Sequence, residues 1–410
     1  MTDRPGFFQY LFKEKNLVRG LLFLLLLYFS YLAVFSESIY GYSDLYTHYF
    51  ISHYAFKYPH LFLNHWGKPL FIALSAPFSQ MGLIGLQFFN ILLSLASAYL
   101  AFLICKELRL KYAWLSILLL CSAPIYFVMA YSGMTEILFG FVLILAVFMF
   151  IKEKYIFTAV LVSLIPYART EGTVFIPLFA FAFLYKRKWL PVLFLFSGFI
   201  FYSTLGYFYN GNFLWFFNEN PYTGAYDIYG KGSLWHFTNS YAEIFGFGLT
   251  VLILLGFIAY ILQLASKKTR NSFSFLEAYI ILLPPLIYFA GHSFVWWKGI
   301  YGSVGLTRVM AGIIPLTAVI GVKGFNLLLP LFEKHKKALI VLVIFLIGLL
   351  VCQPFVIYKI PLVNGPEENV LDEVSAWIRR KKIDDHKIFC LNQYVFYKAG
   401  VNPFDDKKAF

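Results

Sequence analysis

The sequence predicts an all-α polytopic membrane protein with about eleven transmembrane helices and a small α/β segment at the C-terminal end. Of its 410 residues, 60% are hydrophobic and only 13% are charged, whereas soluble domains carry about 25% charged residues. The mean hydropathy is +0.70, and apolar residues gather in runs long enough to cross a bilayer. This composition, with 4 Cys and 28 Gly in no regular period, excludes disordered, collagen-like and disulfide-stapled chains.

The expected spans follow one another at short intervals along the chain. A crossing helix needs about 20 mostly apolar residues. By this measure the spans are residues 20–36, 83–104, 113–130, 135–151, 155–168, 171–185, 190–209, 243–265, 275–291, 307–322 and 338–354. The first follows basic residues and lacks a small-residue cleavage site, so we expect a retained anchor. The pair 155–168 and 171–185 is short, and we expect a broken hairpin inside the membrane.

The distribution of positive charge predicts the orientation of these spans. Lys and Arg outnumber Asp and Glu by 34 to 21, but they lie in short clusters between apolar runs, which is typical of cytoplasmic loops rather than of nucleic-acid binding. One side of the expected membrane collects far more of them. The other side has only Lys57, Lys68, Arg169, Lys231, Lys298 and Arg308 before the C-terminal tail. We therefore predict a multi-pass protein with a cytoplasmic N-terminus and an extracytoplasmic C-terminus. Short loops and the lack of an Asn-x-Ser/Thr sequon favour a bacterial inner membrane.

Three segments on the expected outer side are long: residues 37–82, 210–242 and 292–306. Because the cytoplasmic loops are minimal, we expect the function to reside on the outer face. Residues 1–355 would form the transmembrane catalytic domain, with 37–82 as its first outer loop. Residues 356–410 would form a small extracytoplasmic segment, with a helix that begins at Pro366 and a buried strand from Ile388 to Leu391.

No metal or cofactor site is expected from the sequence. The histidines between residues 48 and 65 are spaced by 5, 7 and 5 residues, which matches no helical metal-binding pair. They are His48, His53, His60 and His65. The cysteines show no metal-ligand spacing either.

Two acidic residues beside the spans are candidate catalytic groups, because ionisable residues there are costly. Asp44 is the only acidic residue between Glu37 and Glu107 and follows Tyr42. Such a carboxylate suits a general base, although it could equally be a helix cap or a solvated loop acid. Glu136 opens an apolar helix on the outer side, where the helix dipole alone would also favour it.

Three basic residues are candidates for binding a phosphate. Lys68 lies beside Trp66 at the expected bilayer surface, where it could also be a snorkelling lysine. Arg308 opens the tenth span, and its guanidinium suits bidentate phosphate binding; the alternative is an interfacial anchor. Arg169 lies two residues before Glu171 in the hairpin break, and the two either bind a ligand or form a structural pair.

With these residues the chain resembles the GT-C superfamily of membrane glycosyltransferases, which includes protein O-mannosyltransferases and the aminoarabinose transferases of lipid A. The resemblance covers residues 1–355 and rests on architecture and on short motifs. Asp44 matches the acidic residue just after the first span, and Lys68-Pro69-Leu70 resembles a Lys-Pro-Pro signature without its second proline. The other matching elements are Ser132 to Glu136, Arg169-Thr170-Glu171-Gly172, and Arg308 with Pro315. The first loop has no Asp-Glu pair, which many members have.

The resemblance implies a fold, a reaction and a set of partners. The donor would be a polyprenyl-phosphate-linked sugar whose phosphate lies between Lys68, Arg169 and Arg308, within the membrane lipids. A glycan, lipid or protein acceptor would lose its hydroxyl proton to a base as the sugar is transferred with inversion. Asp44 and Glu136 would be catalytic. His65, Glu171 and Tyr42 would contact substrate, and neither a metal nor another cofactor would be obligatory.

Three other classes of protein remain as alternatives. A transporter or lipid flippase would carry its ionisable residues at the membrane midplane, often in repeats, and no repeat is present here. A polysaccharide polymerase or ligase of the O-antigen type would have its large outer loop late in the chain, whereas here the longest outer loop is the first one. A scaffold that has lost its activity is the third alternative.

Overall fold

The structure is a computed structural model, and it describes residues 14–221, 230–266, 272–381, 387–405 and 409. Among these residues the chain is a helical bundle without a sheet. Seven helical stretches are long and apolar enough to cross a membrane. They are α2 (Glu14–Phe35), α5 (Leu83–Glu107), α11 with α12 (Leu190–Phe194 and Ser197–Asn210), α16 (Gly246–Ala265), α17 (Ser272–Lys298), η3 with α18 and η4 (Thr307–Ile313, Ile314–Leu328 and Leu329–Phe332), and α19 (Lys336–Ile357).

The other four expected spans are shorter or broken, so the count of eleven stays a prediction. Residues 135–151 and 155–168 are helical as expected, in α8 (Thr135–Ile151) and α9 (Tyr155–Ala168). Residues 171–185 divide into η2 (Thr170–Val174) and α10 (Phe175–Tyr185). The span 113–130 is two short helices, because Pro124 lacks the amide hydrogen that a continuous helix would need there. These helices are α6 (Leu115–Cys121) and α7 (Pro124–Met129).

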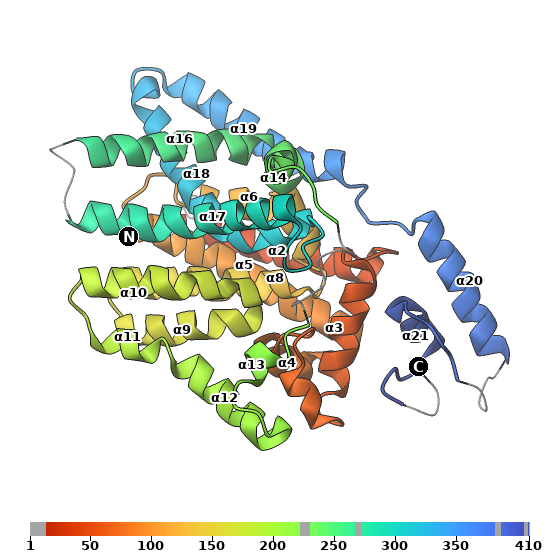
Figure 1. Ribbon diagram of the computed structural model, residues 1–410. Coiled ribbons are helices and arrows are strands. Elements are labelled where there is room, and N and C mark those ends of the chain that lie inside the picture. The colour runs from red at the N-terminus through yellow and green to blue at the C-terminus, as the bar shows by residue number, and fades with distance from the viewer. Residues whose placement is uncertain (1–13, 222–229, 267–271, 382–386, 406–408, 410) are drawn as a thin grey trace, which may run out of the picture.

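The connections gather at the two ends of the bundle as the charge pattern predicts. At one end, ion pairs join Lys106 to Glu14 at 2.6 Å and Lys152 to Glu107 at 2.8 Å, which links three of the segments expected to be cytoplasmic. The long connections and the C-terminal segment lie at the opposite end (Figure 1). They contain α13 (Trp215–Asn218), α14 (His236–Asn239) and α15 (Tyr241–Ile244).

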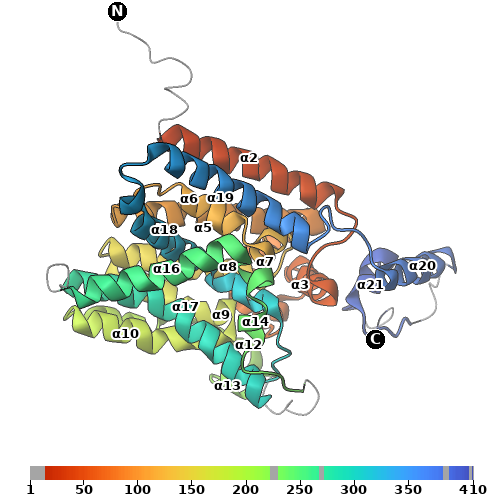
Figure 2. The same cartoon turned by 90° about the horizontal axis from the view of Figure 1, so that it is seen from above.

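Helix α8 lies at the centre of the bundle and packs on α5, α9 and η3. Twelve of its residues are buried, because its sequence is apolar on every face. Helices α2 and α19 lie side by side at one edge (Figure 2), where Tyr28 and Phe355 are in ring contact at 6.4 Å. Both present exposed apolar side chains on their outer faces, as helices that face lipid do.

The expected first outer loop is helical rather than irregular. It contains α3 (Tyr42–Tyr54), η1 (Pro59–Leu63) and α4 (Pro69–Ser79). Helix α4 begins at a proline, which is well suited to the first helical position. Ser52 of α3 and Ser75 of α4 share a hydrogen bond of 2.8 Å, so the two helices form a rigid hairpin.

The C-terminal segment contains α20 (Pro366–Lys381) and α21 (Gln393–Ala399). The expectation of a buried strand from Ile388 to Leu391 is wrong. Ile388 makes only an isolated bridge with Ala409, and Phe389 and Leu391 are exposed. A short apolar run becomes a buried strand only where a neighbouring strand pairs with it, and the described residues offer a single bridging partner.

Candidate active site

The first carboxylate of the site comes from the start of α3. Asp44 lies in the first turn of α3, where the helix dipole favours a negative charge. Its side chain is 33% exposed and forms an ion pair with the guanidinium of Arg308. Helix α3 therefore presents one carboxylate that is held by a cation and is still accessible from solvent.

The second carboxylate is placed by a tightly held turn before α8. The amide of Gln87 donates to the carbonyl of Tyr131 at 2.9 Å, and that of Asn90 donates to the carbonyl of Met134 at 3.0 Å. Both donors belong to α5, so this helix ties the turn to the bundle. Glu136 follows in the first turn of α8 and is only 1% exposed, which makes partners for its charge obligatory.

The break between α9 and α10 places an arginine and a glutamate. Helix α9 ends at Ala168, Arg169 is extended with φ −157° and ψ 132°, and η2 then folds back on the helix. A Cβ on Gly172 would lie 2.4 Å from Cγ2 of Ile165, so only glycine fits in this tight return. The break expected between these two helices is present and carries Arg169 and Glu171, while its place inside the membrane stays a prediction.

Arg308 is placed by η3, which packs against α8. A Cβ on Gly140 of α8 would lie 2.9 Å from the carbonyl oxygen of Gly312. The absence of a side chain on Gly140 therefore lets η3 approach α8 closely enough for Arg308 to reach both Asp44 and Glu136.

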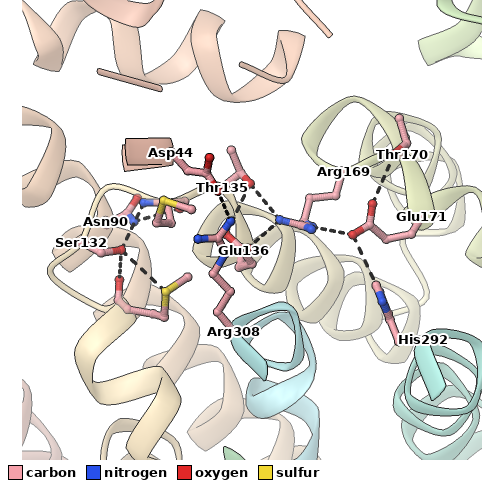
Figure 3. Close-up of polar contacts among 12 residues, drawn as sticks. Asp44, Asn90, Ser132, Thr135, Glu136, Arg169, Thr170, Glu171, His292 and Arg308 are labelled. Carbon is pink, nitrogen blue, oxygen red and sulfur yellow. Dashed lines mark hydrogen bonds and ion pairs between the residues drawn. The ribbon is translucent and has the colours of Figure 1, made fainter. Parts of the chain in front are cut away.

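These groups form one continuous network of charges (Figure 3). Oε1 of Glu136 lies 2.7 Å from an Nη of Arg169 and 3.5 Å from Nε of Arg308. Nε of Arg169 lies 2.7 Å from Oε1 of Glu171. Arg308 closes the other end by its pairing with Asp44. Glu136 is thus the central carboxylate between two guanidinium groups, each of which also holds a second carboxylate.

Lys68 belongs electrostatically to the same site. It precedes α4 and is buried, and burial lowers the pKa of its ammonium group to about 8, although the carboxylates of Glu171 and Glu136 oppose this shift. The three candidate phosphate-binding residues therefore come from three distant parts of the chain to one region of the molecule.

The two remaining sequence candidates lie differently. His65 is buried beside α13, with its ring 4.7 Å from that of Trp215 and 5.4 Å from that of Phe216. Burial lowers the pKa of His65 to about 4, so its imidazole is neutral at pH 7. Tyr42 is exposed at the start of α3 and is not one of the residues of the ion-pair network described above.

Several residues of the site were not anticipated from the sequence. His292 of α17 approaches Oε1 of Glu171 to 3.8 Å, and the hydroxyl of Tyr288 donates to the same carboxylate at 3.4 Å. Thr135 accepts a hydrogen bond of 3.1 Å from Arg169. The available signal was polarity near the end of an expected span, but His292 fell just outside the span 275–291. No group of three or more metal-ligating side chains is present within the described ranges.

The arrangement can carry out two chemical tasks. Arginines and a buried lysine at an apolar surface can bind an anionic phosphate. A carboxylate that is accessible at one side of them can accept a proton from a hydroxyl group.

No protein-family model and no curated protein matches this chain. Among solved structures, it is similar to ArnT from Cupriavidus metallidurans, whose crystal structure contains undecaprenyl phosphate. The TM-score is 0.63 at 11% sequence identity, over 95% of this chain and 85% of ArnT. ArnT is a GT-C glycosyltransferase, and a likeness of this extent at low identity reflects a shared architecture. The chain is therefore an integral multi-pass membrane protein with the GT-C fold.

Proposed function

We propose that this chain is a membrane glycosyltransferase that transfers a sugar from a polyprenyl-phosphate donor to a hydroxyl group of a glycan, lipid or protein acceptor. The observation that carries the proposal is the network from Asp44 through Arg308, Glu136 and Arg169 to Glu171, at one end of a GT-C fold. The similar protein ArnT binds undecaprenyl phosphate, which supports the same class of donor here.

The donor phosphate is held by Arg308, Arg169 and Lys68 in this proposal. Nε of Arg308 is buried and lies 3.5 Å from Oε1 of Glu136, but it makes no hydrogen bond within the described part of the chain, so its N–H can still be offered to a phosphate oxygen. A buried N–H that makes no hydrogen bond is costly, and a hydrogen bond to an anionic ligand would remove that cost. Arginine can bind phosphate and keep a carboxylate at once, because its guanidinium carries five N–H groups.

Asp44 is the general base. The oxygen of the acceptor hydroxyl attacks C1 of the sugar from the side opposite the phosphate, and Asp44 accepts the hydroxyl proton. The bond from C1 to the phosphate oxygen breaks, the polyprenyl phosphate leaves with the electron pair, and the anomeric centre is inverted. Arg308 links the base to the phosphate, because it pairs with Asp44 and also donates hydrogen bonds to the leaving phosphate.

Glu136 has a positioning role in this scheme. At 1% exposure it is too deeply buried to meet an acceptor, whereas its contacts fix Arg169 and Arg308. Glu171, His65 and Tyr42 are proposed to contact substrate around this centre.

The proposal is tested with purified protein and an undecaprenyl-phosphate sugar. Asp44→Asn should lower kcat by about 10²- to 10⁴-fold, because the amide cannot accept the proton. Asp372→Asn is the matched control. Asp372 is also 33% exposed and also pairs with a cation, Lys398 at 3.2 Å, but it lies in the C-terminal segment. Near-normal turnover by a folded Asp44→Asn variant would show that Asp44 is not the general base.

Catalysis is proposed to occur on the extracytoplasmic side. The end of the bundle opposite the site carries the basic connections that are typical of cytoplasmic loops. A periplasmic reporter fused after residue 358 should be active, and the same reporter fused between residues 186 and 188 should not. The reverse pattern would place the site in the cytoplasm.

A further inference from the structure

One buried histidine at the site is not explained by the network of ion pairs. His48 lies on α3 one turn beyond Asp44, so the two side chains share a face of the helix. It is only 5% exposed, and its ring packs at 5.7 Å from that of Phe71 on α4. Its Nδ1 makes no hydrogen bond within the residues that the structure describes. A buried polar atom without a partner is unusual in folded proteins and needs an explanation.

The surroundings of His48 indicate what could satisfy it. Burial lowers the pKa of its imidazole well below the usual value, and Arg308, Lys68 and Arg169 lower it further in that order. The ring is therefore neutral, and it lies within electrostatic reach of all three basic residues that we propose to bind phosphate. A neutral imidazole carries one N–H donor, and this is the group that an anion in the midst of those cations would accept from.

We infer that His48 is a substrate-contacting residue whose Nδ1–H donates a hydrogen bond to the phosphate group of the polyprenyl donor. This inference rests on the proposed function, since it assigns a further contact to the same phosphate.

The inference makes stability and binding respond in opposite directions. In the unliganded protein, His48→Phe replaces a ring whose Nδ1 has no hydrogen bond among the described residues by an apolar ring of similar size, so the thermal midpoint should stay the same or rise. The same change removes a hydrogen bond to a charged group, so the dissociation constant for undecaprenyl phosphate should increase roughly 10- to 100-fold. A residue that served only packing would not separate the two effects in this way.

Three variants and a control decide the question by equilibrium binding of radiolabelled undecaprenyl phosphate to the purified full-length protein. His48→Asn should bind within a few-fold of wild type, because its amide places an N–H close to the position of Nδ1. His48→Leu has a similar branched shape but neither a donor nor a charge, and it should bind at least tenfold more weakly than His48→Asn. His53→Asn is the control on the same helix, because Nδ1 of His53 is already satisfied by the backbone oxygen of Ser79 at 2.8 Å. This control should bind as wild type does.

Each result counts for or against the assignment. Wild-type protein that binds undecaprenyl phosphate while His48→Phe binds it equally well would overturn this inference and leave the proposed function standing. Wild-type protein that does not bind the lipid would overturn both. Should His48→Phe fail to fold, equal affinities of His48→Asn and His48→Leu would overturn the inference.

Discussion

Glu136→Gln tests whether the central carboxylate stabilises the fold by holding two cations. The change keeps the size of the side chain but removes a charge that lies 2.7 Å from Arg169 and 3.5 Å from Arg308. Both guanidinium groups are largely buried. Breaking a buried pair typically costs about 3–5 kcal/mol. Because each arginine keeps its other carboxylate, we expect a loss near the lower end, about 3 kcal/mol of unfolding free energy.

The matched control is Glu14→Gln at the opposite end of the bundle. Its carboxylate lies 2.6 Å from Nζ of Lys106, but the two side chains are 34% and 50% exposed. Water screens such a pair, so the change should cost less than about 1 kcal/mol. Unfolding of both variants is measured by circular dichroism in mixed micelles of increasing dodecyl sulfate content. Equal losses in the two variants would refute the reasoning, because distance alone would then decide the energy rather than burial.

Three further predictions concern the elements that place the site. Gly140→Ala should destabilise the fold by about 1–3 kcal/mol and weaken undecaprenyl phosphate binding, because the new Cβ would meet the backbone of Gly312. The control is Gly348→Ala, which should change neither quantity, because a Cβ at Gly348 would have no atom within 4 Å. Donor affinity should fall as the pH rises through about 8, because burial lowers the pKa of Lys68 to about 8 and its ammonium group loses its charge there. Arginine keeps its charge in this range, so Lys68→Arg should remove the pH dependence, and an unchanged profile in Lys68→Arg would contradict this. Tyr397→Ala should lower kcat and Tyr397→Phe should retain it, because the ring of Tyr397 packs on Tyr46 of α3 at 5.0 Å and so helps to position that helix. If the two variants have equal kcat values with the same donor, the C-terminal segment does not position α3.

Much of the architecture could be predicted because hydropathy and charge are local properties. The long spans were expected close to their observed positions, and the basic connections do lie at one end of the bundle. The break at Arg169 could also be anticipated, because two ionisable residues interrupt an apolar pair of helices. Hydropathy does not predict the division of 113–130, because a sum over side chains takes no account of the backbone donor that Pro124 lacks.

The candidate site was predicted as a set of residues but not as an arrangement. Asp44, Glu136, Arg169, Glu171 and Arg308 were all singled out, and the structure brings them together. Whether Arg169 and Glu171 form a pair was left open by the sequence, and the structure contains that pair at 2.7 Å.

By itself the sequence determined that the chain is a polytopic membrane protein, roughly where its helices begin and end, and which costly polar residues need a purpose. These properties follow from partition free energies that add up residue by residue within a short window. Only the tertiary structure decided that Glu136 is the central carboxylate, that His292 joins the network and that Nδ1 of the buried His48 has no hydrogen bond among the described residues. The reason is that burial and ion pairing depend on which side chains meet across hundreds of residues, as Arg308 and Asp44 do, and no local pattern encodes that meeting.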